Sequence, residues 1–131
     1  MMLLVTGVTG QLGSEAVTAL AGQGHEVIVA DRERMNFLHP QQAAAVVQAE
    51  RPDWVINCAA YTQVDKAESE PETAFTVNRD TPAQLAQAVA DYGGRFLQLS
   101  TDFVFDGSQT HPYVEEDEPN PLGVYGRSKL E

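Results

Sequence analysis

The chain has 131 residues, of which 43% are hydrophobic, with one cysteine and a formal net charge of −11 from 19 acidic and 8 basic residues. This length predicts one domain, and the acidity argues against nucleic acid or an anionic membrane as partner, because both bind basic patches. A single cysteine, Cys58, excludes an internal disulfide and suits a reducing compartment. Residues 1–5 are too short for a signal peptide, and no apolar run approaches the ~18 residues of a membrane-spanning helix. We therefore expect a cytoplasmic protein.

Short apolar runs alternate with amphipathic stretches along the chain. The runs predict buried strands at residues 2–5, 27–30, 54–57 and 95–100. Helical spacing of apolar residues predicts helices at 12–21, 40–50 and about 72–92, and a further helix from Val124. Irregular structure is predicted for 58–71 and for 109–123, which is rich in Pro, Glu, Asp and Asn. The alternation is typical of right-handed βαβ units, so the predicted fold class is α/β: a Rossmann-like, doubly wound parallel sheet over residues 1–131.

Three glycines, Gly7, Gly10 and Gly13, lie between the first predicted strand and the first predicted helix. In a dinucleotide-binding turn the first glycine permits the tight turn, the second lets the backbone approach a pyrophosphate, and the third lets helix pack on strand. The diphosphate then lies over free N–H groups at the helix N-terminus. Ordinary loop chemistry is the alternative, which the strand-before and helix-after context disfavours. The expected cofactor contacts here are Gly7, Thr9, Gly10, Gln11, Leu12 and Gly13.

Asp31 follows the second predicted strand, where a carboxylate can accept hydrogen bonds from adenosine ribose hydroxyls and favour NADH. The neighbouring Arg32 can instead hold a 2′-phosphate and favour NADPH. A solvated Asp-Arg turn is the third interpretation. The sequence leaves NADPH and NADH both open as cofactor.

The third predicted strand ends in small residues, Asn57-Cys58-Ala59-Ala60. Ligands of parallel sheets lie beyond the carboxyl ends of the strands, so small side chains here leave room for a cofactor. Cys58 is interpreted as a small buried group rather than a nucleophile, because no base is evident beside it.

Tyr125 and Lys129 are four residues apart and share one face of the last predicted helix. A phenol with an ordinary pKa near 10 is a poor acid at neutral pH, but a nearby ammonium stabilises the phenolate and makes the phenol a usable proton donor. Thr101, or its neighbour Ser100, follows the fourth predicted strand and can hold a substrate carbonyl by its hydroxyl. A helix cap or turn is the alternative role for Thr101. The three histidines lack metal-ligand spacing, so no metal site is predicted.

Several longer strings are more specific than these motifs. They are Val64-Asp65-Lys66-Ala67-Glu68, the run Ser100-Thr101-Asp102-Phe103-Val104-Phe105, and Tyr125-Gly126-Arg127-Ser128-Lys129. With the glycine loop and Asn57-Cys58-Ala59-Ala60-Tyr61-Thr62, they resemble the extended short-chain dehydrogenase/reductases, and more narrowly the dTDP-4-dehydrorhamnose reductase family. Apart from this resemblance, the charged residues of the segment 65–70 indicate an exposed helical face.

The resemblance implies a reduction in which NAD(P)H delivers hydride to C4 of a dTDP-ketosugar. It implies Tyr125 as proton donor, Lys129 as its activator and nicotinamide-ribose anchor, and Thr101 as third catalytic member. It also implies that Asn36 and Phe37 lie near the adenine, and that Ala59, Ala60 and Thr62 lie near the ribose and phosphates. Magnesium use and a homodimer of the full-length form follow from the resemblance only. Glu15 matches a glutamate associated with magnesium, but no site is predicted from it.

Family members are about twice this length, so residues 1–131 correspond to their N-terminal half, without the later strands and the substrate domain. We expect the chain alone to bind cofactor and to turn over little dTDP-sugar. Three alternatives remain open: a non-catalytic relative such as the regulatory subunit of methionine adenosyltransferase, an NAD(P)-binding sensor, and another NAD-dependent sugar-nucleotide reductase or epimerase.

Overall fold

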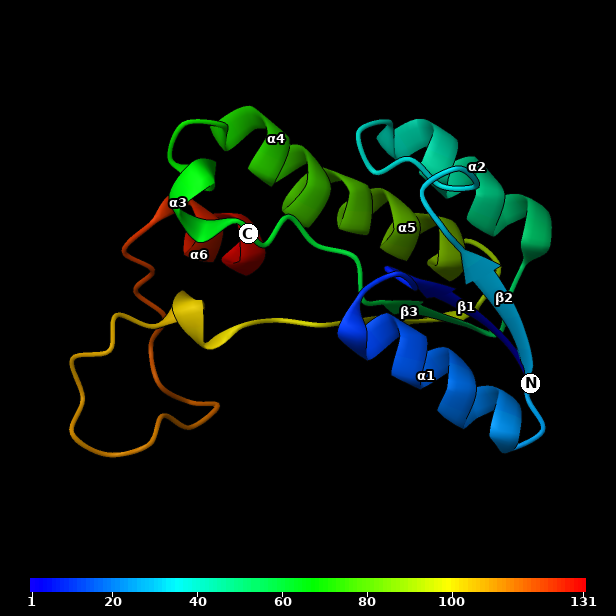
Figure 1. The fold of residues 1–131 in the computed structure, drawn as a ribbon, viewed down its shortest axis with the longest axis horizontal. Coiled ribbons are helices and arrows are strands. Elements are labelled where there is room, and N and C mark those ends of the chain that lie inside the picture. The colour runs from blue at the N-terminus through cyan, green and yellow to red at the C-terminus, as the bar shows by residue number, and fades with distance from the viewer.

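A computed structural model describes residues 1–131 and contains one four-stranded sheet (Figure 1). The strands are β1 (Met2–Thr6), β2 (Glu26–Ala30), β3 (Trp54–Asn57) and β4 (Arg95–Gln98), in the order β2-β1-β3-β4. All three neighbouring pairs are parallel. The predicted parallel α/β sheet is confirmed, although β4 ends two residues before the predicted position.

Helices cover both faces of this sheet (Figure 1). The helix α1 (Gln11–Gly22) lies on one face, whereas α2 (Pro40–Glu50) and α5 (Thr81–Ala90) lie together on the other. Leu4, Val55 and Phe96 are paired across β1, β3 and β4; Leu4 and Val55 belong to the main core under α2 and α5, and Phe96 packs against it. The core is built in register because alternate residues of a strand point to the same face.

The predicted helix at residues 72–92 is divided in the structure. It begins with α4 (Pro71–Phe75), continues as a π-helical turn at Thr76–Asp80, and ends as α5. Pro82 lies in the first turn of α5 and has no N–H to donate to the carbonyl four residues back, at Asn78. A wider turn accommodates the proline ring there, and such turns frequently mark functional sites.

The segment 58–71 contains a short helix, α3 (Val64–Ala67), so the prediction of irregular structure is wrong there, whereas the helical interpretation of 65–70 holds as far as Ala67, which is buried rather than exposed. A 3-10 turn at Asp102–Val104 was not predicted either. The last helix, α6 (Val124–Leu130), begins at the predicted residue. It packs with α3 and α4 around a second small core of Ala67, Ala74 and Val124 (Figure 1).

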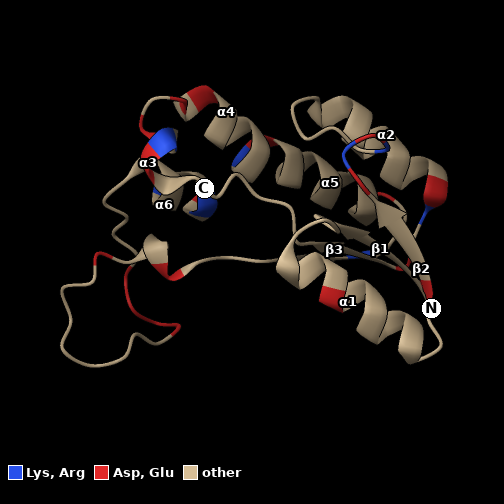
Figure 2. Cartoon of the chain, in the orientation of Figure 1, with Lys and Arg blue, Asp and Glu red and all other residues tan.

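Acidic residues are dispersed over helices and loops rather than gathered on one face (Figure 2). None of the helices combines the length and the apolar character that crossing a membrane requires.

Candidate functional site

The turn between β1 and α1 is packed directly on the end of β3. Gly7 has a φ of +65°, and a Cβ there would lie 2.6 Å from the backbone of Cys58 and Ala59. A Cβ on Gly13 would overlap the backbone of Gly7. The N–H of Gly10 donates to the carbonyl of Gly7 over 2.9 Å and closes the turn. Gly7 and Gly13 are therefore required by close approach, as the glycine spacing predicts.

The N-terminus of α1 has no cap. Gly10 supplies no side chain, and no acidic residue lies in the first turn of the helix. The N–H groups of Gln11, Leu12 and Gly13 donate to no acceptor within the chain. Thr9 is exposed in the same turn. Free N–H groups and the positive end of the helix dipole together favour an anionic group at this position.

A buried polar network lies beneath this edge of the sheet, and the sequence reasoning missed it. The hydroxyl of Thr6 donates to Asn57 Oδ1 over 2.5 Å, and Asn57 Nδ2 donates to Gln98 Oε1 over 2.7 Å. Asn57 Oδ1 also accepts the N–H of Ala59. Thr6 and Asn57 are fully buried. The network ties the ends of β1, β3 and β4 together, and the signal for it was a polar residue at the end of each apolar run.

The structure places Asp31, Arg32, Asn36 and Phe37 in the segment after β2, whose last residue, Ala30, is paired with Thr6 just before the glycine turn. One carboxylate oxygen of Asp31 accepts the N–H groups of Glu33 and Arg34, at 3.1 and 2.9 Å, and the other accepts none. Arg32 is exposed and makes no ion pair. Asn36 holds the N–H of Leu38, and Phe37 packs against the main core. All three interpretations of the Asp-Arg pair remain compatible with this geometry.

Ala59, Ala60 and Thr62 follow β3, and their segment is held in place by Asn78 of the π-helical turn. Asn78 Oδ1 accepts the N–H of Tyr61 over 2.8 Å, while Nδ2 donates to the carbonyl of Tyr61 over 3.0 Å. Nδ2 also donates to the hydroxyl of Ser128 in α6, over 2.9 Å. The side chain of Asn78 is buried and joins the segment after β3 to α6. Sequence reasoning missed this residue as well.

Tyr125 is distinguished from the other tyrosines by its free hydroxyl. The chain has four tyrosines, and the hydroxyls of Tyr61, Tyr92 and Tyr113 donate to Glu70, the Pro52 carbonyl and Asp106 respectively. The hydroxyl of Tyr125 has no partner in the chain. Its ring makes a T-shaped contact with the ring of Phe103, with centroids 5.5 Å apart, and packs against the second core. The side chain is thus held by its ring and leaves its hydroxyl available.

Lys129 is half-buried one turn further along α6. Its Nζ donates to the carbonyl of Leu99 over 2.5 Å, and no carboxylate forms an ion pair with it. Burial lowers the pKa of Lys129 because the charged form is desolvated. The ammonium therefore keeps an uncompensated charge on the face that it shares with Tyr125.

Thr101 lies at the start of the 3-10 turn and acts as its cap. Its Oγ1 accepts the N–H of Phe103 over 3.2 Å and donates to Asp102 over 3.3 Å. The alternative role as a cap is therefore present in this structure, and it leaves one lone pair of the hydroxyl unused. The neighbouring Ser100 is exposed and its hydroxyl has no partner.

A chain of contacts connects the glycine turn to α6. Gly7 packs on Cys58 and Ala59, which follow Asn57. The N–H of Leu99 donates to the carbonyl of Asn57 over 3.4 Å, and the carbonyl of Leu99 accepts a hydrogen bond from Lys129 Nζ. The N-terminal end of α1 and the helix α6 both lie beyond the carboxyl ends of the strands (Figure 1). The structure thus brings the predicted cofactor loop and the predicted Tyr-Lys pair to one edge of the sheet.

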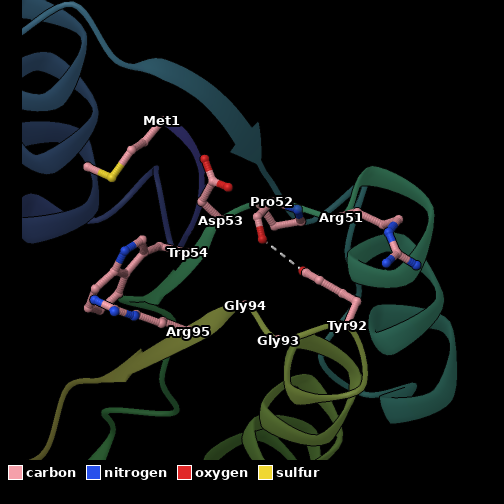
Figure 3. A pocket seen from close by; sticks show the side chains of 9 residues that line it. All are labelled: Met1, Arg51, Pro52, Asp53, Trp54, Tyr92, Gly93, Gly94 and Arg95. Atoms are coloured by element: carbon pink, nitrogen blue, oxygen red, sulfur yellow. Dashed lines mark hydrogen bonds between the residues drawn. The ribbon is translucent and has the colours of Figure 1, made fainter.

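A hollow of about 400 Å³ lies at the opposite edge, where the strands begin (Figure 3). Arg51 stacks over Tyr92 at 4.7 Å and Arg95 over Trp54 at 5.3 Å. Arg51 follows the C-terminal end of α2, where a cation complements the helix dipole. None of the predicted site residues lines this hollow.

The residues present do not fit a magnesium site. No group of three His, Cys, Asp or Glu side chains is placed to hold a metal ion, and Glu15 is exposed on α1. Magnesium, which the resemblance alone implied, is therefore not supported.

Comparison with known proteins agrees with this geometry. Residues 1–131 match the family described as RmlD substrate binding domain. The dTDP-4-dehydrorhamnose reductase of Sinorhizobium fredii is 46% identical over 131 residues, which is 100% of this chain and 44% of that protein. A solved dTDP-4-dehydrorhamnose reductase from Clostridium acetobutylicum has a TM-score of 0.95 at 40% identity, covering 99% of this chain and 46% of its own. That of Bacillus anthracis, in complex with NADP, has a TM-score of 0.92 at 34% identity, covering 98% and 46%.

The chain thus spans less than half the length of these relatives. The match to the family covers every residue of the chain, from the glycine turn to the Tyr-Lys pair. The chain belongs to the RmlD substrate binding domain family.

Proposed function

We propose that residues 1–131 bind a nicotinamide dinucleotide and carry the proton donor of a reductase. The reaction is reduction of the C4 ketone of dTDP-4-dehydro-L-rhamnose to dTDP-L-rhamnose, at the expense of NADPH or NADH. The names of the relatives support this substrate. The observation that carries the proposal is the free hydroxyl of Tyr125, at the same sheet edge as the uncapped N-terminus of α1.

The residues of the chain fit a dinucleotide. The free N–H groups of Gln11, Leu12 and Gly13 are available to a diphosphate, and Asp31 or Arg32 to the adenosine ribose or its phosphate. Lys129 is available to the nicotinamide ribose. When bound, the reduced nicotinamide supplies the hydride. Binding of NADP by the Bacillus anthracis relative supports this class of cofactor.

Tyr125 supplies the proton that the ketone oxygen gains as it becomes a hydroxyl. The phenol loses that proton most readily beside a cation, and Lys129 has no carboxylate partner to offset its charge. Thr101 is the proposed hydrogen-bond donor to the ketone oxygen, a role in which its O–H turns from Asp102 to the substrate. Ser100 is the alternative. One cysteine without a partner fits the reducing cytoplasm that we propose for the protein. The homodimer is proposed from the family resemblance alone.

The test is NADPH oxidation by dTDP-4-dehydro-L-rhamnose, measured for residues 1–131 and for the polypeptide at the length of its relatives. We expect the 131-residue chain to bind NADPH and to oxidise little of it, because the sugar-nucleotide contacts are proposed to lie outside these residues. In the longer form, Tyr125→Phe should lower kcat by about 10²- to 10⁴-fold. Tyr92→Phe, at the opposite edge of the sheet, is the matched control. Cofactor binding without turnover in the longer form would favour the regulatory-subunit alternative.

A further inference from the structure

The helix that carries Tyr125 is capped by a residue that is distant in sequence. Glu68 directly follows α3, and its Oε1 accepts the N–H of Val124 over 2.7 Å. Val124 is the first residue of α6, and the two residues are 56 positions apart. Glu68 is the last residue of the specific string at 64–68. This contact gives it a structural role, whereas neither the proposed cofactor contacts nor the Tyr-Lys pair involve it.

The start of α6 is built to receive this carboxylate. Gly123 at the N-cap position has no side chain, and a Cβ there would lie 2.8 Å from Glu68 Oε1. The helix has only seven residues, so its own hydrogen bonds stabilise it weakly. A carboxylate at its N-terminus satisfies a free N–H and complements the helix dipole. The N-terminus of α1, which we propose for the diphosphate, has no such carboxylate.

The carboxylate of Glu68 has no interaction partner in the chain other than the N-terminus of α6. The neighbouring Lys66 pairs with Glu70 at 3.1 Å, and Glu70 also accepts the hydroxyl of Tyr61. Glu68 forms no ion pair. Next to it, Ala67 is fully buried against Val124 in the second core. The segment 67–68 therefore holds the first turn of α6 by packing and by a hydrogen bond together.

We infer that Glu68 is a positioning residue for Tyr125. It fixes the backbone of Val124, one residue before the phenol, while Lys129 anchors the other end of α6 on Leu99. The inference rests on the proposed function for the part that concerns cofactor and catalysis. The cap itself is independent of that function.

The experiment compares four forms of the 131-residue chain: wild type, Glu68→Ala, Glu68→Gln and Glu72→Ala. Glu72 is an exposed glutamate of α4 without a hydrogen-bond partner and serves as the matched control. Amide hydrogen exchange of α6 is measured by NMR, and binding of NADPH and of ADP by titration. In Glu68→Ala we expect exchange of the Val124 amide to be roughly tenfold faster. The increase in the exchange rate of the Val124 amide should be small in Glu68→Gln, because its amide oxygen is still an acceptor at the same distance. Glu72→Ala should show no increase.

Comparing the affinities for NADPH and for ADP distinguishes a positioning role of Glu68 from a general loss of structure. Glu68→Ala should weaken NADPH binding and leave ADP binding unchanged, because only NADPH extends to Lys129. Equal weakening of both ligands would overturn the positioning role. Unchanged exchange at Val124 in Glu68→Ala, or equally fast exchange in Glu68→Gln, would overturn the cap. If the wild-type chain binds neither nucleotide, the proposed function fails, and the exchange rates still decide the cap.

Discussion

The ammonium of Lys129 donates to the main-chain carbonyl of Leu99 over 2.5 Å, one residue beyond the end of β4. This contact fixes the last turn of α6 to the carboxyl edge of the sheet. The N–H of Leu99 donates to the carbonyl of Asn57, the last residue of β3, and Gly7 packs on the two residues that follow it. The proposed proton donor on α6 and the proposed anion site at the start of α1 are therefore joined through one series of contacts, and carbonyl reduction depends on such fixed relative positions.

Tyr125→Phe should leave the stability of the chain almost unchanged. The hydroxyl of Tyr125 has no partner, and phenylalanine keeps the contact of the ring with Phe103. We expect the free energy of unfolding to change by less than about 0.5 kcal/mol. Tyr92→Phe removes the donor to the buried Pro52 carbonyl and should cost about 1 kcal/mol. Urea unfolding of both variants measures the difference, and an equal loss in the two would show that the Tyr125 hydroxyl has a partner.

Asp31→Ala should weaken NADH more than NADPH. One oxygen of Asp31 is used by Glu33 and Arg34, so the second oxygen is the one available to ribose hydroxyls. Loss of a charge-assisted hydrogen bond predicts a roughly tenfold higher Kd for NADH. NADPH should lose less, because Arg32 remains for its 2′-phosphate.

Asp31→Asn is the second arm of this experiment, because its amide oxygen preserves the turn at Glu33 and Arg34 and removes only the charge. If Asp31→Ala lowered the affinity for NADH and for NADPH equally, Asp31 would not be the residue that binds the ribose hydroxyls. A loss in Asp31→Ala that Asp31→Asn fully restores would assign the effect to the turn.

The predictable part of this structure is local in sequence. Apolar runs identified the four strands, and the glycine spacing identified the turn that packs on β3, because strand burial and tight turns depend on neighbouring residues. The start of α6 at Val124 was predicted from its flanking loop. The local pattern also placed Tyr125 and Lys129 on one helix face.

The contacts that position the site are distant in sequence and were not predicted. Glu68 reaches Val124 over 56 positions, Asn78 reaches Ser128 over 50, and Lys129 reaches Leu99 over 30. Each joins a side chain to a group that no periodicity relates to it. The π-helical turn that directs Asn78 inward has a local cause in Pro82 and was missed because the surrounding residues read as one continuous helix.

Asn78→Ala should destabilise the chain more than removal of an exposed asparagine. The side chain satisfies the N–H and carbonyl of Tyr61 and the hydroxyl of Ser128, and it is 5% exposed. Leaving buried groups without partners predicts a loss of about 2 kcal/mol or more. Asn120→Ala, whose amide binds Asp106 at the surface, is the control and should cost less.

Asn78→Asp tests which bonds matter. A carboxylate can still accept the N–H of Tyr61 but cannot donate to the Tyr61 carbonyl or to Ser128. We expect it to be nearly as destabilising as alanine in urea unfolding. Wild-type stability in Asn78→Asp would mean that the donor contacts contribute nothing and that Asn78 does not join the two segments.

Acid should destabilise the chain partly through Asp106. Its carboxylate accepts the N–H of Ser108, the amide of Asn120 and the hydroxyl of Tyr113, and these bonds hold the pKa of Asp106 well below its ordinary value of 3.8. A carboxyl with a lowered pKa in the folded state contributes stability that is present above 3.8 and is lost as the pH falls below it. The Tm of the wild type should therefore fall as the pH is lowered through this range.

Asp106→Asn removes this contribution, so its Tm should be lower than that of the wild type at neutral pH and should depend less on pH below about 4. Some acid dependence should remain, because hydrogen bonds from Tyr61 and Lys66 lower the pKa of Glu70 as well. Asp65→Asn, on the exposed side of α3, should follow the wild-type curve. Parallel Tm curves for Asp106→Asn and the wild type would show that the hydrogen bonds of Asp106 do not stabilise the loop that leads from Thr101 to α6.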